Sequence, residues 1–179
     1  MKDRKLLNIE LGRISPEEYR TGRPRSGIVL VLDNVRSAHN AGSAFRTADA
    51  FGVDKVYLGG ITPVPPSAEL HKVALGAEES VPSEHVDDVP ALVARLQAGG
   101  YTVIAVEQTV NSVKLNGFRP LKGKKYALIF GNEVEGVQQS VVDAADFSLE
   151  IPQKGTKHSL NVSVSVGVVL WALSQAVDS

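Results

Sequence analysis

Cysteine is absent from this chain of 179 residues, which excludes disulfide bonds, thiolate metal sites and cysteine nucleophiles. Such a composition suits a reducing compartment, and we expect a cytoplasmic protein. Long apolar runs are also absent. The longest, from Val168 to Leu173, is far shorter than the ~20 residues that span a bilayer. We therefore expect no membrane segment.

Neither sign of charge is in large excess, since the formal net charge is -1. The chain as a whole therefore has no strong attraction for nucleic acid. Its bases are nevertheless clustered in three stretches, although such clusters are also common on ordinary solvated surfaces. The clusters comprise Lys2, Arg4, Lys5, Arg13, Arg20, Arg23 and Arg25; then Lys114, Arg119, Lys122, Lys124 and Lys125; and then Lys154, Lys157 and His158.

Several familiar cofactor and catalytic motifs are missing. No G-x-G-x-x-G follows a strand pattern, and no G-x-S-x-G marks a hydrolase nucleophile. Residues 117–125 resemble a P-loop only superficially, because the glycine spacing is wrong and Lys125 stands where Ser or Thr should bind magnesium. The histidines, at 39, 71, 85 and 158, show no ligand spacing with one another, so we expect no metal site.

Short apolar runs of strand length alternate with helical patterns. Strands are predicted over residues 28–32, 55–58, 102–106, 126–130 and 147–151. Helices are predicted after Asn40 as N-cap, from Asp88 to Gly99, and over residues 138–144. This alternation predicts an α/β fold in which a parallel sheet is flanked by helices on both faces.

The domain organisation is simple. With 43% hydrophobic residues, the chain is long enough for one ordinary globular core. Residues 1–26 are interpreted as a short N-terminal helical arm, and residues 27–179 as one domain. Within that domain, Val162, Val164, Val166 and Val168 alternate with small polar residues or glycine. Period and β-branching favour a strand here over a helix.

Three polar, glycine-containing segments follow predicted strands: residues 34–47, 130–137 and 151–164. Parallel sheets bind ligands beyond the carboxyl ends of their strands, so the three segments could converge on one pocket. Each residue also has a purely structural interpretation. Asn40 could only cap a helix, for example, and Arg46 could only be a surface arginine.

In order and spacing these segments closely resemble the SpoU/TrmH family of RNA ribose 2′-O-methyltransferases. The resemblance covers about residues 28–173. One such motif is weak, but three in the right order are specific. The matching residues are Asn40, Gly42 and Arg46; then Phe130, Gly131, Asn132, Glu133 and Gly136; and then Ile151, Pro152, Ser159, Leu160, Asn161, Val162, Ser163 and Val164.

The resemblance implies a fold and a set of partners. The fold would be a SPOUT α/β fold whose C-terminal segment forms a deep trefoil knot, with a helix over residues 161–176 in place of the strand favoured by periodicity. The protein would be a homodimer with its active site near the knot and the subunit interface. The cofactor would be S-adenosylmethionine, and the substrate tRNA or rRNA.

The resemblance also implies roles for individual residues. Those expected at the reaction site are Arg46, Asn40, Glu133, Ser159 and Asn161. Those expected to bind the cofactor are Phe130, Gly131, Asn132, Glu133, Ile151, Pro152, Ser159 and Leu160.

Arginine essentially never deprotonates in proteins, so we interpret Arg46 as a phosphate clamp and charge stabiliser, not as a base. Methyl transfer from a sulfonium needs positioning and no metal. Two alternatives stay open at this point. One is base N-methylation by a related knotted enzyme, and the other is an RNA-binding protein of the same fold without turnover.

Overall fold

The computed structural model describes residues 3–177, with side chains as far as Ser174, and within this range the sheet has seven strands, all parallel. In space the strands lie in the order β3-β2-β1-β6-β4-β7-β5. The strands are β1 (Ile28–Asp33), β2 (Lys55–Gly59), β3 (Ser83–Val86), β4 (Tyr101–Val106), β5 (Val113–Lys114), β6 (Lys125–Phe130) and β7 (Phe147–Glu150).

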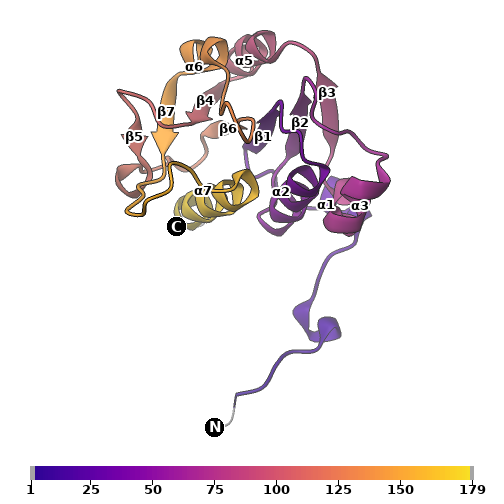
Figure 1. Cartoon of the computed structure of the whole chain (residues 1–179). Coiled ribbons are helices and arrows are strands. Elements are labelled where there is room, and N and C mark those ends of the chain that lie inside the picture. Colours follow the sequence, from indigo (N-terminus) through magenta and orange to yellow (C-terminus); the bar gives the residue numbers. More distant parts are fainter. Residues whose placement is uncertain (1–2, 178–179) are drawn as a thin grey trace.

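Helices cover both faces of the sheet, as Figure 1 shows. One face carries α5 and α6, and the opposite face carries the other α-helices, with α2 and α7 lying across it. The helices are α1 (Pro16–Thr21), α2 (Ala38–Ala50), α3 (Ala68–Ala74), α4 (Ala77–Ser80), α5 (Val89–Ala98), α6 (Gln139–Ala144) and α7 (Val162–Val177), with short 3-10 turns η1 (Asn8–Leu11) and η2 (Leu115–Gly117).

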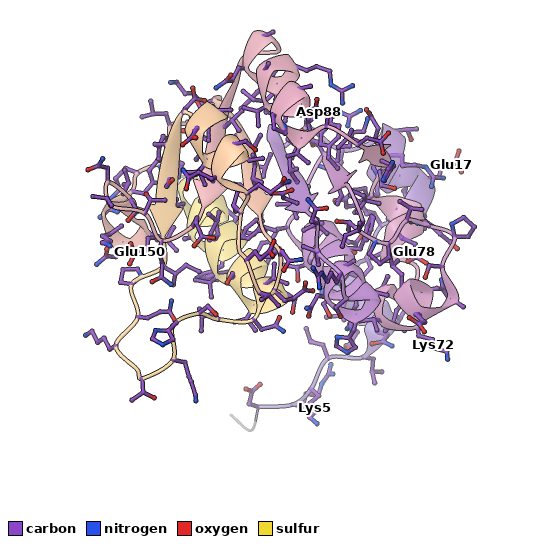
Figure 2. The ribbon with its side chains drawn as sticks, turned by 45° about the horizontal axis from the view of Figure 1, so that its top comes forward. Lys5, Glu17, Lys72, Glu78, Asp88 and Glu150 are labelled. Carbon is purple, nitrogen blue, oxygen red and sulfur yellow. The ribbon has the colours of Figure 1, made fainter. Side chains whose placement is uncertain are left out.

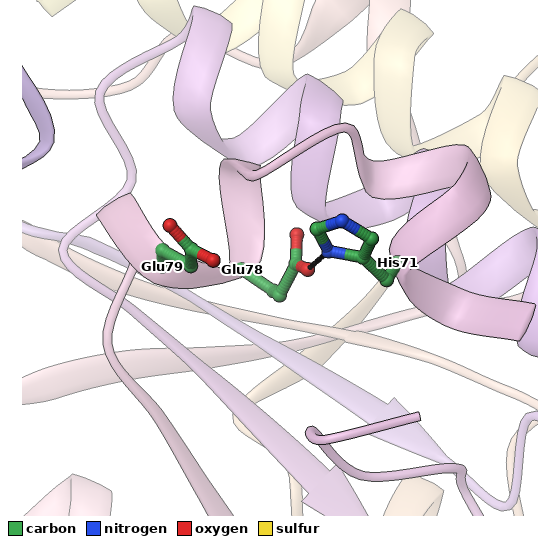
Figure 3. A group of neighbouring side chains, drawn as sticks. All are labelled: His71, Glu78 and Glu79. Carbon is green, nitrogen blue, oxygen red and sulfur yellow. Dashed lines mark hydrogen bonds and ion pairs between the residues drawn. The ribbon is translucent and has the colours of Figure 1, made fainter. Parts of the chain in front are cut away.

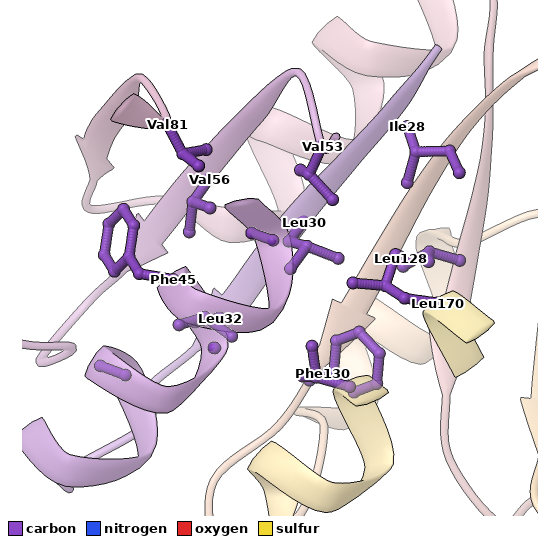
Figure 4. Close-up of a cluster of buried hydrophobic side chains, with 14 of the residues drawn as sticks. Ile28, Leu30, Leu32, Phe45, Val53, Val56, Val81, Leu128, Phe130 and Leu170 are labelled. Atoms are coloured by element: carbon purple, nitrogen blue, oxygen red, sulfur yellow. The ribbon is translucent and has the colours of Figure 1, made fainter. Parts of the chain in front are cut away.

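The core is divided into two parts by the central strand β1. Ile28, Leu30 and Leu32 point to the face covered by α2 and α7, where they belong to one buried cluster with Phe45 and Leu170 (Figure 4). The alternate residues of β1 point to the face covered by α5 and α6. Because side chains alternate along a strand, a strand buried on both faces needs apolar residues at successive positions, as β1 has from Ile28 to Leu32.

The predicted α/β class, the parallel sheet and its five apolar strands are confirmed. The helices predicted from Asp88 to Gly99 and over residues 138–144 are confirmed as α5 and α6. Asp88 caps α5 by accepting a hydrogen bond from the Ala91 amide at 2.8 Å. No helix in residues 3–177 has both the length and the apolarity needed to cross a membrane.

The predicted N-cap of the first long helix was wrong. α2 begins at Ala38, and Ser37 caps it by accepting a hydrogen bond from the Asn40 amide at 3.2 Å. Asn40 therefore lies in the first turn. Its side chain is free to make contacts elsewhere, which matters for the site described below.

The strand favoured over residues 162–168 was also wrong, and the helix implied by the family resemblance is confirmed as α7. The alternating valines divide between two faces of this helix. Val166 is buried, whereas Val164 and Val168 are 50% and 37% exposed. Two residues correspond to about 200° of helical rotation, so alternate residues of a helix can lie on nearly opposite sides.

The second half of the N-terminal arm packs on the domain. The Tyr19 side chain of α1 is buried, and its hydroxyl donates to the carbonyls of Ala48 and Val53. Arg23 lies over the Tyr19 ring and forms an ion pair with Asp54 at 3.3 Å. Residues 3–14 extend away from the body in Figure 1. Lys2 and residues 178–179, which belong to the predicted arm and domain, lie outside the described residues.

Candidate active site

The carboxyl ends of three neighbouring strands, β6, β4 and β7, surround a cavity of about 560 Å³. Its walls are residues 130–136 after β6, residues 106–108 after β4, and the segment after β7 as far as α7. In Figure 2 this last segment leaves the body after Glu150, runs outward and returns to α7. The volume is in the range of small-molecule and cofactor sites, and the location is the usual one for a parallel sheet.

The cavity is lined with acid. Glu107, Glu133, Glu135 and Glu150 lie on its wall, and no lysine or arginine does. Glu150 is already paired with Lys114 and Ser112, and these two contacts lower the pKa of its carboxyl. The lining therefore favours a ligand that carries positive charge and disfavours a bare phosphate group.

Backbone contacts shape the loop after β6. Asn132 and Gly136 exchange backbone hydrogen bonds of 2.9 and 3.0 Å, and the Asn132 side chain accepts hydrogen bonds from the amides of Val134 and Glu135. A Cβ on Gly131 would lie 2.0 Å from the carbonyl carbon of Gly136. Glycine at 131 is thus required by the loop's own tight closure.

Glu133 joins this loop to the segment after β1. Its carboxylate accepts hydrogen bonds from the amide of Arg36 at 3.0 Å, the amide of Ser37 at 3.1 Å and the side chain of Asn40 at 2.9 Å. Glu133 is largely exposed, and the partial burial of its carboxyl opposes ionisation. Together, the hydrogen bonds from Asn40 and from backbone amides outweigh this effect of burial, and they lower the pKa of the Glu133 carboxyl.

Asn161 joins the third segment to the same network. Its side-chain oxygen accepts a hydrogen bond from the Ser163 amide at 2.9 Å, at the start of α7. Its side-chain nitrogen donates to Asn40 Oδ1 at 3.2 Å. Hydrogen bonds thus run from Asn161 to Asn40 and from Asn40 to Glu133, so one residue from each of the three segments takes part.

The structure brings most of the predicted residues to the cavity. Those that line it are Phe130, Gly131, Asn132, Glu133, Ile151, Ser159, Leu160 and Asn161. Asn40 reaches this group through its hydrogen bonds. Pro152 and Arg46 are not part of the lining. Arg46 is exposed on α2 and has no hydrogen-bond or ion-pair partner among residues 3–174, whose side chains the structure describes.

Sequence reasoning missed two residues at the end of β4. Glu107 accepts a hydrogen bond from the Val137 amide at 3.0 Å, and Gln108 donates to the His158 carbonyl at 2.6 Å. Adjacent residues therefore hold two different walls of the cavity. They belong to no glycine-containing motif, and the only sequence signal was their position directly after a buried parallel strand.

Residues 27–171 match the sequence model of the SpoU rRNA Methylase family. The chain belongs to this family. The resemblance seen in the three segments is therefore confirmed.

Two curated relatives are named 23S rRNA (guanosine-2'-O-)-methyltransferase RlmB. The protein from Nitrosomonas europaea is 36% identical over 159 residues, covering 87% of this chain and 58% of its own length. The protein from Coxiella burnetii is 32% identical over 162 residues, covering 86% of this chain and 60% of its own length. The chain thus spans less than two thirds of these relatives.

Solved structures agree with the SpoU fold. The A. aeolicus TrmH/SpoU tRNA modifying enzyme superposes with a TM-score of 0.79 at 27% identity, covering 91% of this chain and 81% of that one. The AdoMet-bound rRNA methyltransferase from Sinorhizobium meliloti superposes with a TM-score of 0.76 at 30% identity, covering 89% of this chain and 60% of that one.

Proposed function

We propose that this SpoU family member transfers a methyl group from S-adenosylmethionine to a ribose 2′-hydroxyl of tRNA or rRNA. The observation that carries the proposal is the hydrogen-bonded network of Asn161, Asn40 and Glu133 beside an acid-lined cavity. The names of the relatives support the reaction, because they are rRNA 2′-O-methyltransferases.

The cavity suits the proposed cofactor. S-adenosylmethionine supplies a methyl group that its sulfonium charge already activates. A cationic sulfonium and ammonium complement a wall that carries four glutamates and no lysine or arginine. The neighbour from Sinorhizobium meliloti, described as AdoMet-bound, supports the same cofactor. Backbone around Gly131, Ile151 and Leu160 would hold it, with Phe130, Asn132, Pro152 and Ser159 completing the rim.

Arg46 is proposed to act on RNA and not on the cofactor. It is exposed on α2, one and a half helical turns beyond Asn40, and outside the cavity lining. A guanidinium in this position can clamp a phosphate next to the target ribose and stabilise the charge that develops as the 2′-hydroxyl loses its proton. The proton then passes to phosphate or water, because arginine does not accept one.

A homodimer is proposed through the outer face of α7. Val164, Val168 and Trp171 lie on one side of this helix and are 50%, 37% and 59% exposed. The family resemblance suggests that the partner's Arg46 would then reach the cavity. Light scattering tests this: Trp171→Asp should yield monomers, and Val110→Asp, at a fully exposed loop position, should not. A dimer that survives Trp171→Asp would reject this interface.

Three further features rest on family membership. We propose that the segment leading into α7 is threaded as a deep trefoil knot, that the domain comprises residues 27–179 with 1–26 as its arm, and that the protein works in the cytoplasm, where its RNA substrate is found. The absence of cysteine is consistent with that compartment.

The proposed reaction is tested by incubating the protein with methyl-labelled S-adenosylmethionine and total RNA, then identifying the labelled nucleoside by mass spectrometry. A 2′-O-methylated nucleoside is expected. A base-methylated nucleoside would instead indicate N-methylation. RNA binding without any label, by protein that binds the cofactor, would indicate a module without turnover.

A further inference from the structure

A second group of chemically capable side chains lies on the pair of short helices α3 and α4. Leu75 and Gly76 between these helices have positive φ angles of 54° and 90°, and the chain reverses there. The reversal brings His71 of α3 opposite Glu78 and Glu79 of α4, as Figure 3 shows. None of these three residues lines the cofactor cavity.

The three side chains offer one imidazole nitrogen and two carboxylate groups, with ligand atoms that all lie within 4.8 Å of one another. His71 Nδ1 lies 2.5 Å from Glu78 Oε1. In Figure 3 the Glu78 carboxylate lies between His71 and Glu79. Nothing in the cofactor site or in the family motifs accounts for this arrangement.

Glu78 supplies a separate reason to expect a ligand. Its side chain is only 7% exposed, and its second oxygen, Oε2, is buried with no hydrogen-bond partner. A buried carboxylate oxygen without a partner is unfavourable, and a proton on His71 faces only Oε1. Glu79 makes no side-chain ion pair within the described residues, although its backbone carbonyl accepts a hydrogen bond from Arg20. The group thus carries more negative charge than the histidine can neutralise.

We propose that His71, Glu78 and Glu79 form a divalent transition-metal site of the Zn²⁺ type. Nitrogen and carboxylate ligands suit zinc, whereas calcium and magnesium prefer oxygen alone. Zinc–ligand distances of about 2.0–2.2 Å place the ligand atoms of a tetrahedral site about 3.5 Å apart. His71 Nδ1 and Glu78 Oε1, now 2.5 Å apart, would therefore separate as the metal enters between them, and Glu79 would approach. Glu79 is exposed and can turn inward to achieve this. The fourth position would hold water.

A metal at this site would act on the fold and not on methyl transfer, and the proposal departs from the expectation of a metal-free protein. That expectation compared histidines only with one another, whereas the partners of His71 are glutamates seven and eight residues later. A metal here would fasten α3 to α4. α3 in turn supports α2, whose Gly42 packs so closely that a Cβ there would lie 2.7 Å from the Leu70 carbonyl oxygen. The metal would therefore stabilise the base of the helix that carries Asn40 and Arg46.

Calorimetric titration of chelator-treated protein with zinc chloride tests the site without reference to methyl transfer. One Zn²⁺ per chain is expected, together with a rise in the thermal unfolding midpoint as zinc is added. Glu79→Gln is the decisive variant, because the His71–Glu78 ion pair survives in it and an exposed side chain tolerates the change. It should weaken zinc binding by at least about 10-fold, as should His71→Ala.

His85→Gln is the matched control, since His85 is exposed on β3 and outside the group. This variant should bind zinc like the wild type. No binding at millimolar zinc would overturn the proposal. Unchanged affinity in Glu79→Gln would also overturn it, because the group would then be an ion pair and not a three-ligand site.

Discussion

Replacing Glu133 by glutamine is the most informative perturbation of the proposed active site. The two side chains have nearly the same shape, so the substitution changes hydrogen bonding and charge and leaves packing intact. In the wild type, Oε2 accepts from the Arg36 amide, while Oε1 accepts from the Ser37 amide and from Asn40. All three partners are donors, and the amide group of glutamine must present a donor to at least one of them.

The less costly orientation places the glutamine nitrogen against the Arg36 amide and keeps the two bonds to the other oxygen. Asn40 cannot compensate by flipping its own amide, because its Oδ1 accepts from Asn161 at 3.2 Å. A net hydrogen bond to a charged group contributes about 1.5–3 kcal/mol. Glu133 is exposed, so solvent reduces this to about 1–2 kcal/mol. That free energy corresponds to a decrease of about 5- to 30-fold in the equilibrium constant for ordering the segment after β1.

Single-turnover methyl transfer at saturating S-adenosylmethionine measures this loss directly. Glu133→Gln should slow the rate by about 5- to 30-fold. Glu135→Gln is the matched control, because Glu135 lines the same cavity but its carboxylate has no hydrogen-bond partner among residues 3–174. The control removes the same charge without touching the network. Equal rates in the two variants would refute the claim that Glu133 orders the segment carrying Asn40.

Other predictions concern separate parts of the site. Arg46→Ala should cut turnover by at least ~100-fold with nearly unchanged cofactor affinity, and Arg46→Lys should restore little; near-normal turnover would reject the phosphate clamp. Gln108→Ala should weaken cofactor binding by about 5- to 10-fold in calorimetry, since a net hydrogen bond of about 1 kcal/mol holds the loop at His158; unchanged affinity would reject this role. The pKa of Glu133 is lowered in the fold. Its contribution to ordering the segment after β1 is therefore present above the ordinary Glu pKa of 4.5, and it is lost as the pH falls through the lower pKa of the folded protein. Wild-type cofactor binding should therefore fall on acidification, and Glu133→Gln should lack that component. Arg25→Ala should weaken RNA binding and leave the thermal midpoint unchanged, whereas Arg23→Ala should lower the midpoint, because Arg23 is paired with Asp54.

The sheet was largely predictable from sequence because its central strands are buried on both faces. Such strands are mostly apolar, and five were found. β3 and β5 were missed for the opposite reason. Both lie at the edges of the sheet, β5 has only two residues, and the residues of β3 are partly or fully exposed. Their sequences therefore carry no apolar run.

Periodicity failed at α7 because this helix carries valine on two faces. Val166 packs in the core, while Val164 and Val168 form part of the exposed apolar face. A helix with only one apolar face would have shown the usual spacing of three and four residues. In α7 the valines of the two apolar faces alternate along the chain, so the sequence has the two-residue period that is typical of a strand.

The candidate site was predictable where glycine and polar residues directly follow strands. It was less predictable where a side chain forms its contacts with residues distant in the sequence. Asn40 was expected as a cap, but Ser37 takes that position and leaves Asn40 to join two other segments. Arg23 was counted with the basic residues of the arm, but it packs on Tyr19. Long-range pairing of this kind leaves no local signal in the sequence.

Alkaline hydrolysis of RNA methylated by this protein tests the central claim most directly. Cleavage of RNA by base requires a free 2′-hydroxyl next to the phosphate, so a 2′-O-methyl group protects its own linkage. With methyl-labelled S-adenosylmethionine and wild-type protein, the label should appear in alkali-resistant dinucleotides, and Arg46→Ala should produce little of it. Label found only in mononucleotides would place the methyl group on a base and contradict ribose methylation.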